Sequence, residues 1–397
     1  MTIQNNFIFF DDHNRENLLP LTFTRPVVDF RVGITTIKEK WESLGVVSCS
    51  YHTVDYLSKK FPMNLNKDNL FVNSCLIPDR KLIERIISLN PGEVLQHNDF
   101  VLAYRASEPI PANLLKDNSK KTIEYHGTFL CIRNPWDIFT LNDTVLREDY
   151  LHITAGRKSQ PISNTNRVLG EGHLFIEEGA KVECATINTI TGPVYIGSDA
   201  EVMEGSLIRG PFALCRHSTL KMGAKIYGAT SIGPYCKVGG EVNNSVFFSY
   251  SNKAHDGFLG NSVIGEWCNL GADTNNSNLK NNYVPVKLWN YIKSGFIDTG
   301  FQFCGLIMGD HSKCGISTMF NTGTVVGVSA NIFGPGFPRN FVPSYSWGGS
   351  GGFMVYKTNK ALKTAEIVMK RRNISLTEVD IEILNHIFEQ TKKYRKE

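Results

Sequence analysis

Polar and charged side chains gather in two stretches in the second half of the chain, residues 209–221 and 250–280. His255 lies in the second stretch, and an imidazole, which titrates near neutral pH, can accept a proton from an attacking group. Arg216 lies in the first, and a guanidinium can hold a phosphate dianion through paired hydrogen bonds. The plain alternative is that both are solvated residues in surface turns. Which of the two interpretations holds depends on the elements that position these side chains.

From Ile196 to Val238, every sixth residue is aliphatic: Ile196, Val202, Ile208, Leu214, Leu220, Ile226, Ile232 and Val238. An α-helix repeats every 3.6 residues and a strand every 2, so neither explains this period. A six-residue repeat is typical of a parallel β-helix, in which short strands and turns stack and the aliphatic side chains point into a narrow prism. The repeat is weak from Val168, returns at Ile264, breaks over 275–300 as an extruded loop, and resumes from Met308 to Ile332.

Composition sets broad limits on the protein class. The chain has 397 residues, 42% of them hydrophobic, and a formal net charge of +4. This length favours two domains, and the near balance of charge argues against a protein that coats nucleic acid. Nine cysteines without a CxxC pair suggest reduced thiols in a cytoplasm. We expect no signal peptide and no membrane-spanning segment, because residues 1–6 are polar and no run approaches ~20 apolar residues.

The first half of the chain alternates apolar runs with helical patterns, which implies an α/β fold with a mostly parallel sheet. We expect strands at 7–10, 46–48 and 70–72, and helices at 33–42 and 81–89. The polar segment 155–161 is expected to be a linker or exposed loop. The predicted domains are therefore 1–160, 161–352 and a charged helical extension over 353–397.

Several segments resemble a known family. Residues 210–216, 251–260 and 269–274 resemble the hexapeptide-repeat acetyltransferase half of bifunctional GlmU, which acetylates glucosamine 1-phosphate and then uridylylates it. Hallmark segments of the divergent GlmU-like proteins of Bacteroidetes resemble residues 19–26, 265–272, 309–313 and 346–349, and that resemblance covers nearly the whole chain. It implies an α/β nucleotidyltransferase-like domain followed by a left-handed parallel β-helix with a C-terminal helix. It also implies a homotrimer with acetyl-CoA sites between subunits.

The resemblance assigns roles to residues on the turns and the extruded loop. His255 matches the general base, which takes a proton as the sugar amine attacks the thioester, and Arg216 matches an arginine that holds the sugar phosphate. Asn269 matches an asparagine at the sugar site, although an inward asparagine ladder is the alternative. His311 lies on a later coil, where the family binds the CoA end, and is a second candidate base. Further substrate-binding candidates are Lys253, Phe258, Asn276 and Lys280.

This sequence departs from the family pattern at the acceptor site. Phe258 stands where the family has a tyrosine that helps bind the substrate phosphate, and Asn243 falls near its phosphate-binding lysine. Lys253 is one residue closer to His255 than the family's lysine is. Residues 275–276 replace an Asn-Tyr-Asp-Gly segment, and Lys280 or Lys287 could replace the lysine that follows it. These departures affect which acceptor substrate is expected more than which type of reaction is expected.

The other half of GlmU is a sugar-1-phosphate nucleotidyltransferase, whose glycine-rich loop cradles a triphosphate with backbone amides. Residues 7–10 supply its first strand and residues 20–22 fit its Pro-Leu-Thr segment, but residues 11–15 replace the loop and the Gly-Asp strand end that ligates Mg²⁺ is missing. The remaining candidates are Arg15, Arg25 and Arg31 for phosphates, and Asp11 and Asp12 for Mg²⁺. The alternative is that these arginines form structural ion pairs in a degenerate, regulatory or merely sugar-nucleotide-binding domain.

Three functional hypotheses follow. The first is a cytoplasmic bifunctional enzyme that transfers acetyl from acetyl-CoA to glucosamine 1-phosphate and then makes UDP-N-acetylglucosamine. The second keeps only a nucleotidyltransferase, acting for example on glucose 1-phosphate with UTP or dTTP, with the β-helix as a trimerisation scaffold; Phe258 and Asn243 favour it. The third is a non-catalytic sugar-nucleotide-binding scaffold, which the missing glycine-rich loop favours. All three imply small-molecule ligands, without nucleic acid or membrane.

Overall fold

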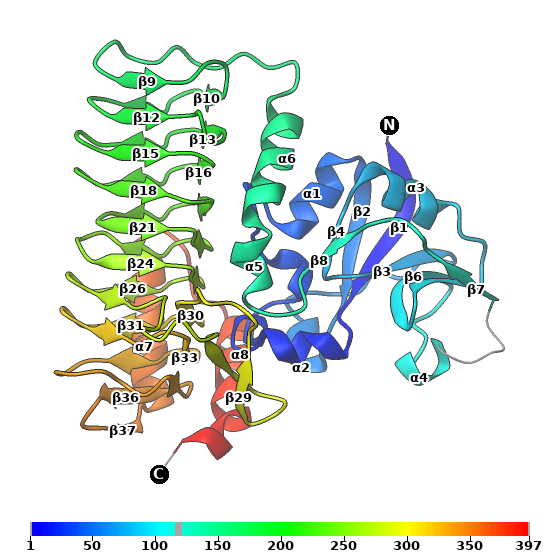
Figure 1. Ribbon diagram of the computed structural model, residues 1–397. Helices are drawn as coiled ribbons and strands as arrows, with labels where there is room; N and C mark the ends of the chain where they lie inside the picture. The colour runs from blue at the N-terminus through cyan, green and yellow to red at the C-terminus, as the bar shows by residue number, and fades with distance from the viewer. Residues whose placement is uncertain (1, 116–120, 396–397) are drawn as a thin grey trace. The chain divides into compact units, whose positions relative to one another are not determined.

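The computed structural model describes residues 2–115 and 121–395 (Figure 1). The chain forms two compact units. The first contains residues up to 18, 24–30 and 35–134; the second contains 19–23, 31–34 and everything from 135 onward. The predicted domain boundaries at residues 160 and 352 stay a prediction. None of the described helices is long and apolar enough to cross a membrane.

The first unit is built on a six-stranded mixed sheet in the order β2-β1-β3-β6-β5-β7. The strands are β1 (Ile3–Phe10), β2 (Val46–His52), β3 (Asn69–Asn73), β5 (Glu93–His97), β6 (Phe100–Ala106) and β7 (Lys121–Glu124), with a separate pair β4 (Leu76–Ile77) and β8 (Leu130–Cys131). The helices are α1 (Ile37–Ser43), α2 (Asp55–Ser58), α3 (Arg80–Ile87) and α4 (Ala112–Leu115). The predicted strands and both predicted helices are confirmed, although the first helix begins at Ile37, after the capping box of Thr36 and Glu39.

The sheet is mixed, although most of its strand pairs are parallel, as expected. β1 pairs in parallel with β2 and β3, and β5 with β7, but β6 is antiparallel to both β3 and β5. The cause is local: β5 and β6 are joined by a short turn in which Asn98 adopts a positive φ of 51°, and such a turn makes a hairpin. Trp41 of α1 packs on Phe7 and Phe9 of β1, with ring centroids 5.8 and 5.6 Å away.

The second unit is a parallel β-helix with three faces, which confirms the predicted left-handed hexapeptide-repeat architecture. One face has nine strands: β10 (Leu174–Ile176), β13 (Val194–Ile196), β16 (Phe212–Leu214), β19 (Thr230–Ile232), β22 (Val246–Phe247), β25 (Val263–Ile264), β30 (Leu306–Met308), β33 (Thr324–Val326) and β35 (Phe341–Val342). The ten-stranded face holds β11 (Lys181–Val182), β14 (Glu201–Val202), β17 (Thr219–Leu220), β20 (Lys237–Val238), β23 (Asn252–Lys253), β26 (Asn269–Leu270), β31 (Lys313–Cys314), β34 (Asn331–Ile332), β36 (Ser346–Gly349) and β37 (Gly352–Val355). The six-stranded face holds β9 (Arg167–Leu169), β12 (Thr186–Asn188), β15 (Leu207–Arg209), β18 (Lys225–Tyr227), β21 (Glu241–Asn243) and β24 (Phe258–Gly260).

The hexad side chains fill the prism as predicted. All eight aliphatic residues from Ile196 to Val238 are at most 3% exposed and belong to one continuous core. Ile196 pairs with Leu214, and Leu214 with Ile232, so the same face returns in each coil. The β-helix also continues through residues 239–263, although the six-residue repeat is lost there. The repeat is lost because the coils of this segment are shorter: Val238 pairs with Lys253 rather than with the residue eighteen positions further along the chain.

The break in the repeat begins later than predicted. Asn275 and Asn276 form β27 (Asn275–Asn276), which still pairs with β32 (Met319–Phe320) in a later coil. The extruded segment then folds as a hairpin of β28 (Lys287–Asn290) and β29 (Gly295–Asp298). Helices flank the coil in sequence: α5 (Asp137–Thr140) and α6 (Asn142–Thr154) precede it, and α7 (Thr358–Lys370) and α8 (Glu378–Gln390) form the predicted C-terminal helical extension.

The prism core yields a direct test on neighbouring residues of β15. Ile208 is 3% exposed inside the coil, whereas Leu207 is 51% exposed outside it. Ile208→Ala should destabilise the second unit by about 2–5 kcal/mol, because it removes three buried carbons and leaves a cavity. Leu207→Ala is the matched control and should change stability by less than about 0.5 kcal/mol. Equal shifts in the denaturation midpoints of the two variants would contradict the inward placement of Ile208.

Candidate active site

His255 lies on the turn between β23 and β24, at the corner where the ten-stranded face meets the six-stranded face. Its side chain is exposed, and it makes no side-chain hydrogen bond to the described residues. Its backbone is held, because the carbonyl oxygen of His255 accepts a hydrogen bond from Nζ of Lys253 at 2.9 Å. The imidazole is therefore open to an incoming molecule while its backbone stays fixed.

Lys253 points into the prism, so a direct contact with substrate, as the resemblance implied, does not match its position. It follows Val238 in the inward row of the ten-stranded face and is 1% exposed. Its ammonium reaches back to the corner and donates to the carbonyls of His255 and Gly239, the latter at 3.1 Å. Burial lowers the pKa of Lys253 to about 8. Lys253 thus ties two successive turns together.

Glycines allow the turns at this corner to stack closely. Gly240 has a φ of +72°, and a Cβ there would lie 2.9 Å from the carbonyl oxygen of His255. Gly257, with a φ of +119°, would place a Cβ 2.1 Å from the carbonyl oxygen of Thr274 in the next turn. Since only glycine tolerates both the φ and the contact, the sequence fixes the height of the His255 turn in the stack.

Two further predicted residues lie on other parts of the coil. Arg216 is exposed at the turn before β17, next to His217. His311 is half-buried before β31 and stacks on Trp267, with ring centroids 6.3 Å apart. His311 ends an aromatic ladder that runs along one corner of the coil through His217, Tyr235, Tyr250 and Trp267.

The remaining substrate-binding candidates make contacts within the coil. Asn276 is 3% exposed, and its side chain accepts a hydrogen bond from the amide of Gly260 at 3.0 Å, as an inward asparagine would. Phe258 is half-buried on β24. Nζ of Lys280 donates to the carbonyl oxygen of Pro285 at 3.2 Å, within the extruded loop. Asn269 points outward instead, so the inward ladder proposed as its alternative is at Asn276.

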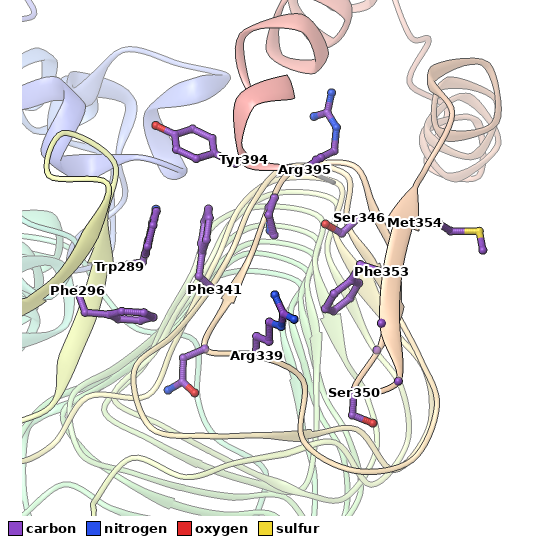
Figure 2. Close-up of a pocket in the computed structure, with 15 residues that line it drawn as sticks. Trp289, Phe296, Arg339, Phe341, Ser346, Ser350, Phe353, Met354, Tyr394 and Arg395 are labelled. Atoms are coloured by element: carbon purple, nitrogen blue, oxygen red, sulfur yellow. The ribbon is translucent and has the colours of Figure 1, made fainter. Parts of the chain in front are cut away.

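Two of the hollows on the described part of the second unit are relevant to the site. One, of about 720 Å³, is at the last coils and is lined by Trp289, Phe341, Phe353 and Arg339 among others, with Phe341 and Phe353 on opposite sides (Figure 2). It contains none of the predicted residues. The other, of about 590 Å³, lies between the ten-stranded face and α7 and contains Asn269 and Ala254, the residue that joins Lys253 to His255.

Sequence reasoning missed the cations of this second hollow. Lys237, Lys313, Arg371 and Arg372 all line it, although up to 135 positions (372 − 237) separate them in the chain. The six-residue repeat could have shown that Lys237 and Lys313 point outward on the same face. Each directly precedes an inward residue, Val238 and Cys314 respectively. The repeat does not extend to α7 or to the residues after it, so the sequence could not predict where Arg371 and Arg372 lie relative to the coil.

In the first unit, Asp11 is saturated with donors. Its side chain is 2% exposed and accepts hydrogen bonds from Ser74 Oγ at 2.5 Å, Thr53 Oγ1 at 2.6 Å and the amide of Val27 at 3.1 Å, with Nε of Arg15 at 3.4 Å. Three hydrogen-bond donors and the guanidinium of Arg15 thus surround this carboxylate, which fits a structural role.

Asp12 joins two strand ends. Its carboxylate accepts from Asn14 twice, at 2.9 Å each, and from Nδ2 of Asn73 at 3.0 Å. Among the described residues no group of three or more His, Cys, Asp and Glu side chains is arranged to hold a metal ion. Since Mg²⁺ is often bound by one or two carboxylates together with substrate phosphates, Asp11 and Asp12 stay its predicted ligands.

The three candidate phosphate-binding arginines are buried. Arg15 is 6% exposed and donates to the hydroxyl of Tyr56 at 3.2 Å, and Arg25 is 8% exposed. Arg31 is 5% exposed and belongs to the second unit, where it donates to the carbonyl oxygen of Ile34 and lies 3.6 Å from Sγ of Cys215. These contacts favour the structural alternative for Arg15 and Arg31.

Known proteins match parts of the chain. Residues 7–158 match a family model described as sugar nucleotidyl transferase. A bifunctional sugar-1-phosphate nucleotidylyltransferase/acetyltransferase of Sulfurisphaera tokodaii is 32% identical over 231 residues, 55% of this chain and 48% of that protein. The bifunctional protein GlmU of Methanocaldococcus jannaschii is 32% identical over 215 residues, 54% of this chain and 46% of that protein. The chain thus spans about half the length of these curated relatives.

Among solved structures, LpxA of Bacteroides fragilis, a UDP-N-acetylglucosamine acyltransferase, covers 59% of this chain and 84% of its own at 14% identity, with a TM-score of 0.29. That score reflects only loose overlap. The family model and the two relatives together confirm the predicted resemblance to bifunctional nucleotidyltransferase/acetyltransferase proteins.

The buried ammonium of Lys253 predicts a pH dependence of stability. Its pKa is about 8 in the fold and near 10.5 in the unfolded chain, so between these values the unfolded state binds more protons. The stability of the wild type should therefore rise by about 2–3 kcal/mol relative to Lys253→Met between pH 7 and pH 10. Lys181→Met, which removes an exposed lysine of the same face, is the control. Parallel stability–pH curves for the wild type and Lys253→Met would rule out a buried ammonium.

Proposed function

We propose that the second unit transfers acetyl from acetyl-CoA to the amine of an amino-sugar phosphate, with glucosamine 1-phosphate as the acceptor. The first unit then carries out nucleotidyl transfer with UTP, so that the chain makes UDP-N-acetylglucosamine. The names of the two bifunctional relatives support this class of reaction. The observation that carries it is the exposed imidazole of His255 on a turn whose backbone is held by Lys253.

The chemistry assigned to His255 is proton removal. The amine nitrogen attacks the thioester carbonyl carbon, a C–N bond forms and the C–S bond breaks. The ammonium proton leaves to the imidazole, and the departing CoA thiolate takes up a proton. Lys253 acts as a positioning residue, because it fixes the turn without touching the substrate. Arg216 and Asn269 are the proposed contacts to the acceptor, and His311 is the second candidate base.

We propose further that the enzyme is a cytoplasmic homotrimer. The resemblance of the second unit to hexapeptide-repeat acetyltransferases supports this assembly, because that family packs as a homotrimer. Acetyl-CoA sites between subunits, as in the resembling family, would place a second copy of the chain beside the His255 turn.

A second candidate function for the first unit is binding of a sugar nucleotide without turnover. Two observations favour it: the 3-10 helix His13–Leu18 occupies the place of a glycine-rich loop, and the Asp11 carboxylate is already saturated. In that case the bifunctional proposal reduces to acetyl transfer in the second unit.

The acetyl-transfer proposal predicts the effect of one substitution. His255→Ala should lower kcat for CoA release from acetyl-CoA and glucosamine 1-phosphate by about 100-fold or more, because the general base is lost. His173→Ala removes another exposed histidine of the second unit and should leave the rate unchanged. CoA release at the wild-type rate by His255→Ala would remove this residue from the mechanism.

The nucleotidyl-transfer proposal is tested separately. With UTP, N-acetylglucosamine 1-phosphate and Mg²⁺, the purified chain should release pyrophosphate only when the sugar phosphate is present. UDP-N-acetylglucosamine that binds in calorimetry, without any pyrophosphate release from the forward reaction, would instead establish the binding-only candidate. Screening glucose 1-phosphate and dTTP in the same assay identifies the preferred pair.

A further inference from the structure

Helix α7 lies against the ten-stranded face and closes one side of the 590 Å³ hollow described above. Ala361, Ala365 and Met369 are the buried residues of the helix. Just beyond its last turn, Nη2 of Arg372 donates to Oδ1 of Asn252 on β23 at 3.3 Å. The hollow therefore has a rigid floor of outward strand residues and a wall that ends in two consecutive arginines.

Four cationic side chains face this hollow without acidic partners. Lys237, Lys313, Arg371 and Arg372 line it, no Asp or Glu lines it, and none of the four forms an ion pair in the described part of the chain. Two arginines elsewhere on this unit are paired: Arg147 with Asp143 at 3.0 Å and Arg157 with Glu177 at 2.5 Å. Clustering like charges in this way destabilises the fold, so the cluster is not explained by stability.

The charges of the cluster act on Lys237. Burial lowers the pKa of Lys237, and the charges of Arg372, Lys221 and Arg371 lower it further, while Glu201 opposes them with the smallest effect. Burial also lowers the pKa of Lys313 to about 8, and within the described part of the chain its Nζ donates only to the carbonyl oxygen of His311, at 2.8 Å. An anion in the hollow would remove the repulsion and supply the missing acceptors.

The chemistry of the lining indicates which anion. Two guanidiniums favour phosphoryl oxygens, which they bind through paired hydrogen bonds. Four positive charges exceed what a single phosphate monoester neutralises, whereas a diphosphate group brings more charge and more acceptor oxygens. Beside the cations, the rings of Tyr250 and Trp267 stack at 4.2 Å and form an aromatic edge of the hollow. A volume of about 590 Å³ is ample for a small organic molecule.

We propose that the hollow between α7 and the ten-stranded face is a binding site for a diphosphate-bearing ligand, held by Lys237, Lys313, Arg371 and Arg372. The ligand is a diphosphate diester such as a nucleoside diphosphate sugar or coenzyme A, which share this group. The site is distinct from the proposed nucleotidyl-transfer centre, which belongs to the first unit. It does not require His255 to be a base.

Calorimetric titration of the full chain with inorganic pyrophosphate tests the site. Arg371→Gln/Arg372→Gln should weaken binding at least about tenfold, because each guanidinium provides charge-assisted hydrogen bonds. The matched control is Lys363→Gln/Lys370→Gln, which removes the same charge from exposed positions of α7 outside the hollow and should bind like the wild type. Lys237→Gln, a change at an exposed strand position, provides a second reading and should also weaken binding.

The wild type and the three variants are then titrated with UDP-N-acetylglucosamine and with CoA, without a second substrate. Weakened binding of either ligand by the arginine variant supports the site and identifies the source of the diphosphate.

Removing the repulsion between the cations should also raise the melting temperature of the arginine variant in low salt without ligand, and added salt should abolish that gain. Pyrophosphate binding that is absent from the wild type, or equal in the wild type and in both the arginine and Lys237 variants, would overturn the proposal. Because no acetyl-CoA is turned over, failure here leaves the acetyl-transfer proposal standing.

Discussion

The second unit depends on the stacking of one inward side chain per strand in a narrow prism. Ile196, Leu214 and Ile232 lie in register in successive coils, and the same holds on the other two faces. Backbone hydrogen bonds between coils fix the spacing, while the buried aliphatic groups supply the free energy that holds the coils together. Everything functional on this unit is therefore carried at a turn, on an outward position, or on a segment that leaves the coil.

Lys253 shows how this constraint is used at the candidate active site. It occupies an inward position where the preceding residue of its row is Val238, and burying an ammonium there costs free energy. Its two hydrogen bonds to turn carbonyls offset part of that cost and fix the backbone of His255. A destabilising residue in an otherwise apolar core thus coincides with the turn that carries the proposed base.

The sequence predicts the coil well because its signal is periodic: each inward aliphatic residue is dictated by the same steric requirement in every coil. The prediction weakens over 239–263, where shorter coils break the hexad, and at Lys253, whose polar side chain gives no sign that it points inward. The cations of α7 could not be placed, because no repeat relates a helix after the last coil to strands more than 100 residues earlier. The hydrogen bonds that saturate Asp11 come from Thr53 and Ser74, and a sequence pattern does not reveal such distant partners.

The central claim is that the His255 turn receives the amine of the acceptor sugar. A crystal structure of the chain with bound glucosamine 1-phosphate measures this directly. The account predicts the sugar nitrogen within hydrogen-bonding reach, about 3 Å, of an imidazole nitrogen of His255, with the backbone of the turn unmoved. A sugar bound in full occupancy at another coil, with its amine out of reach of His255, would contradict it.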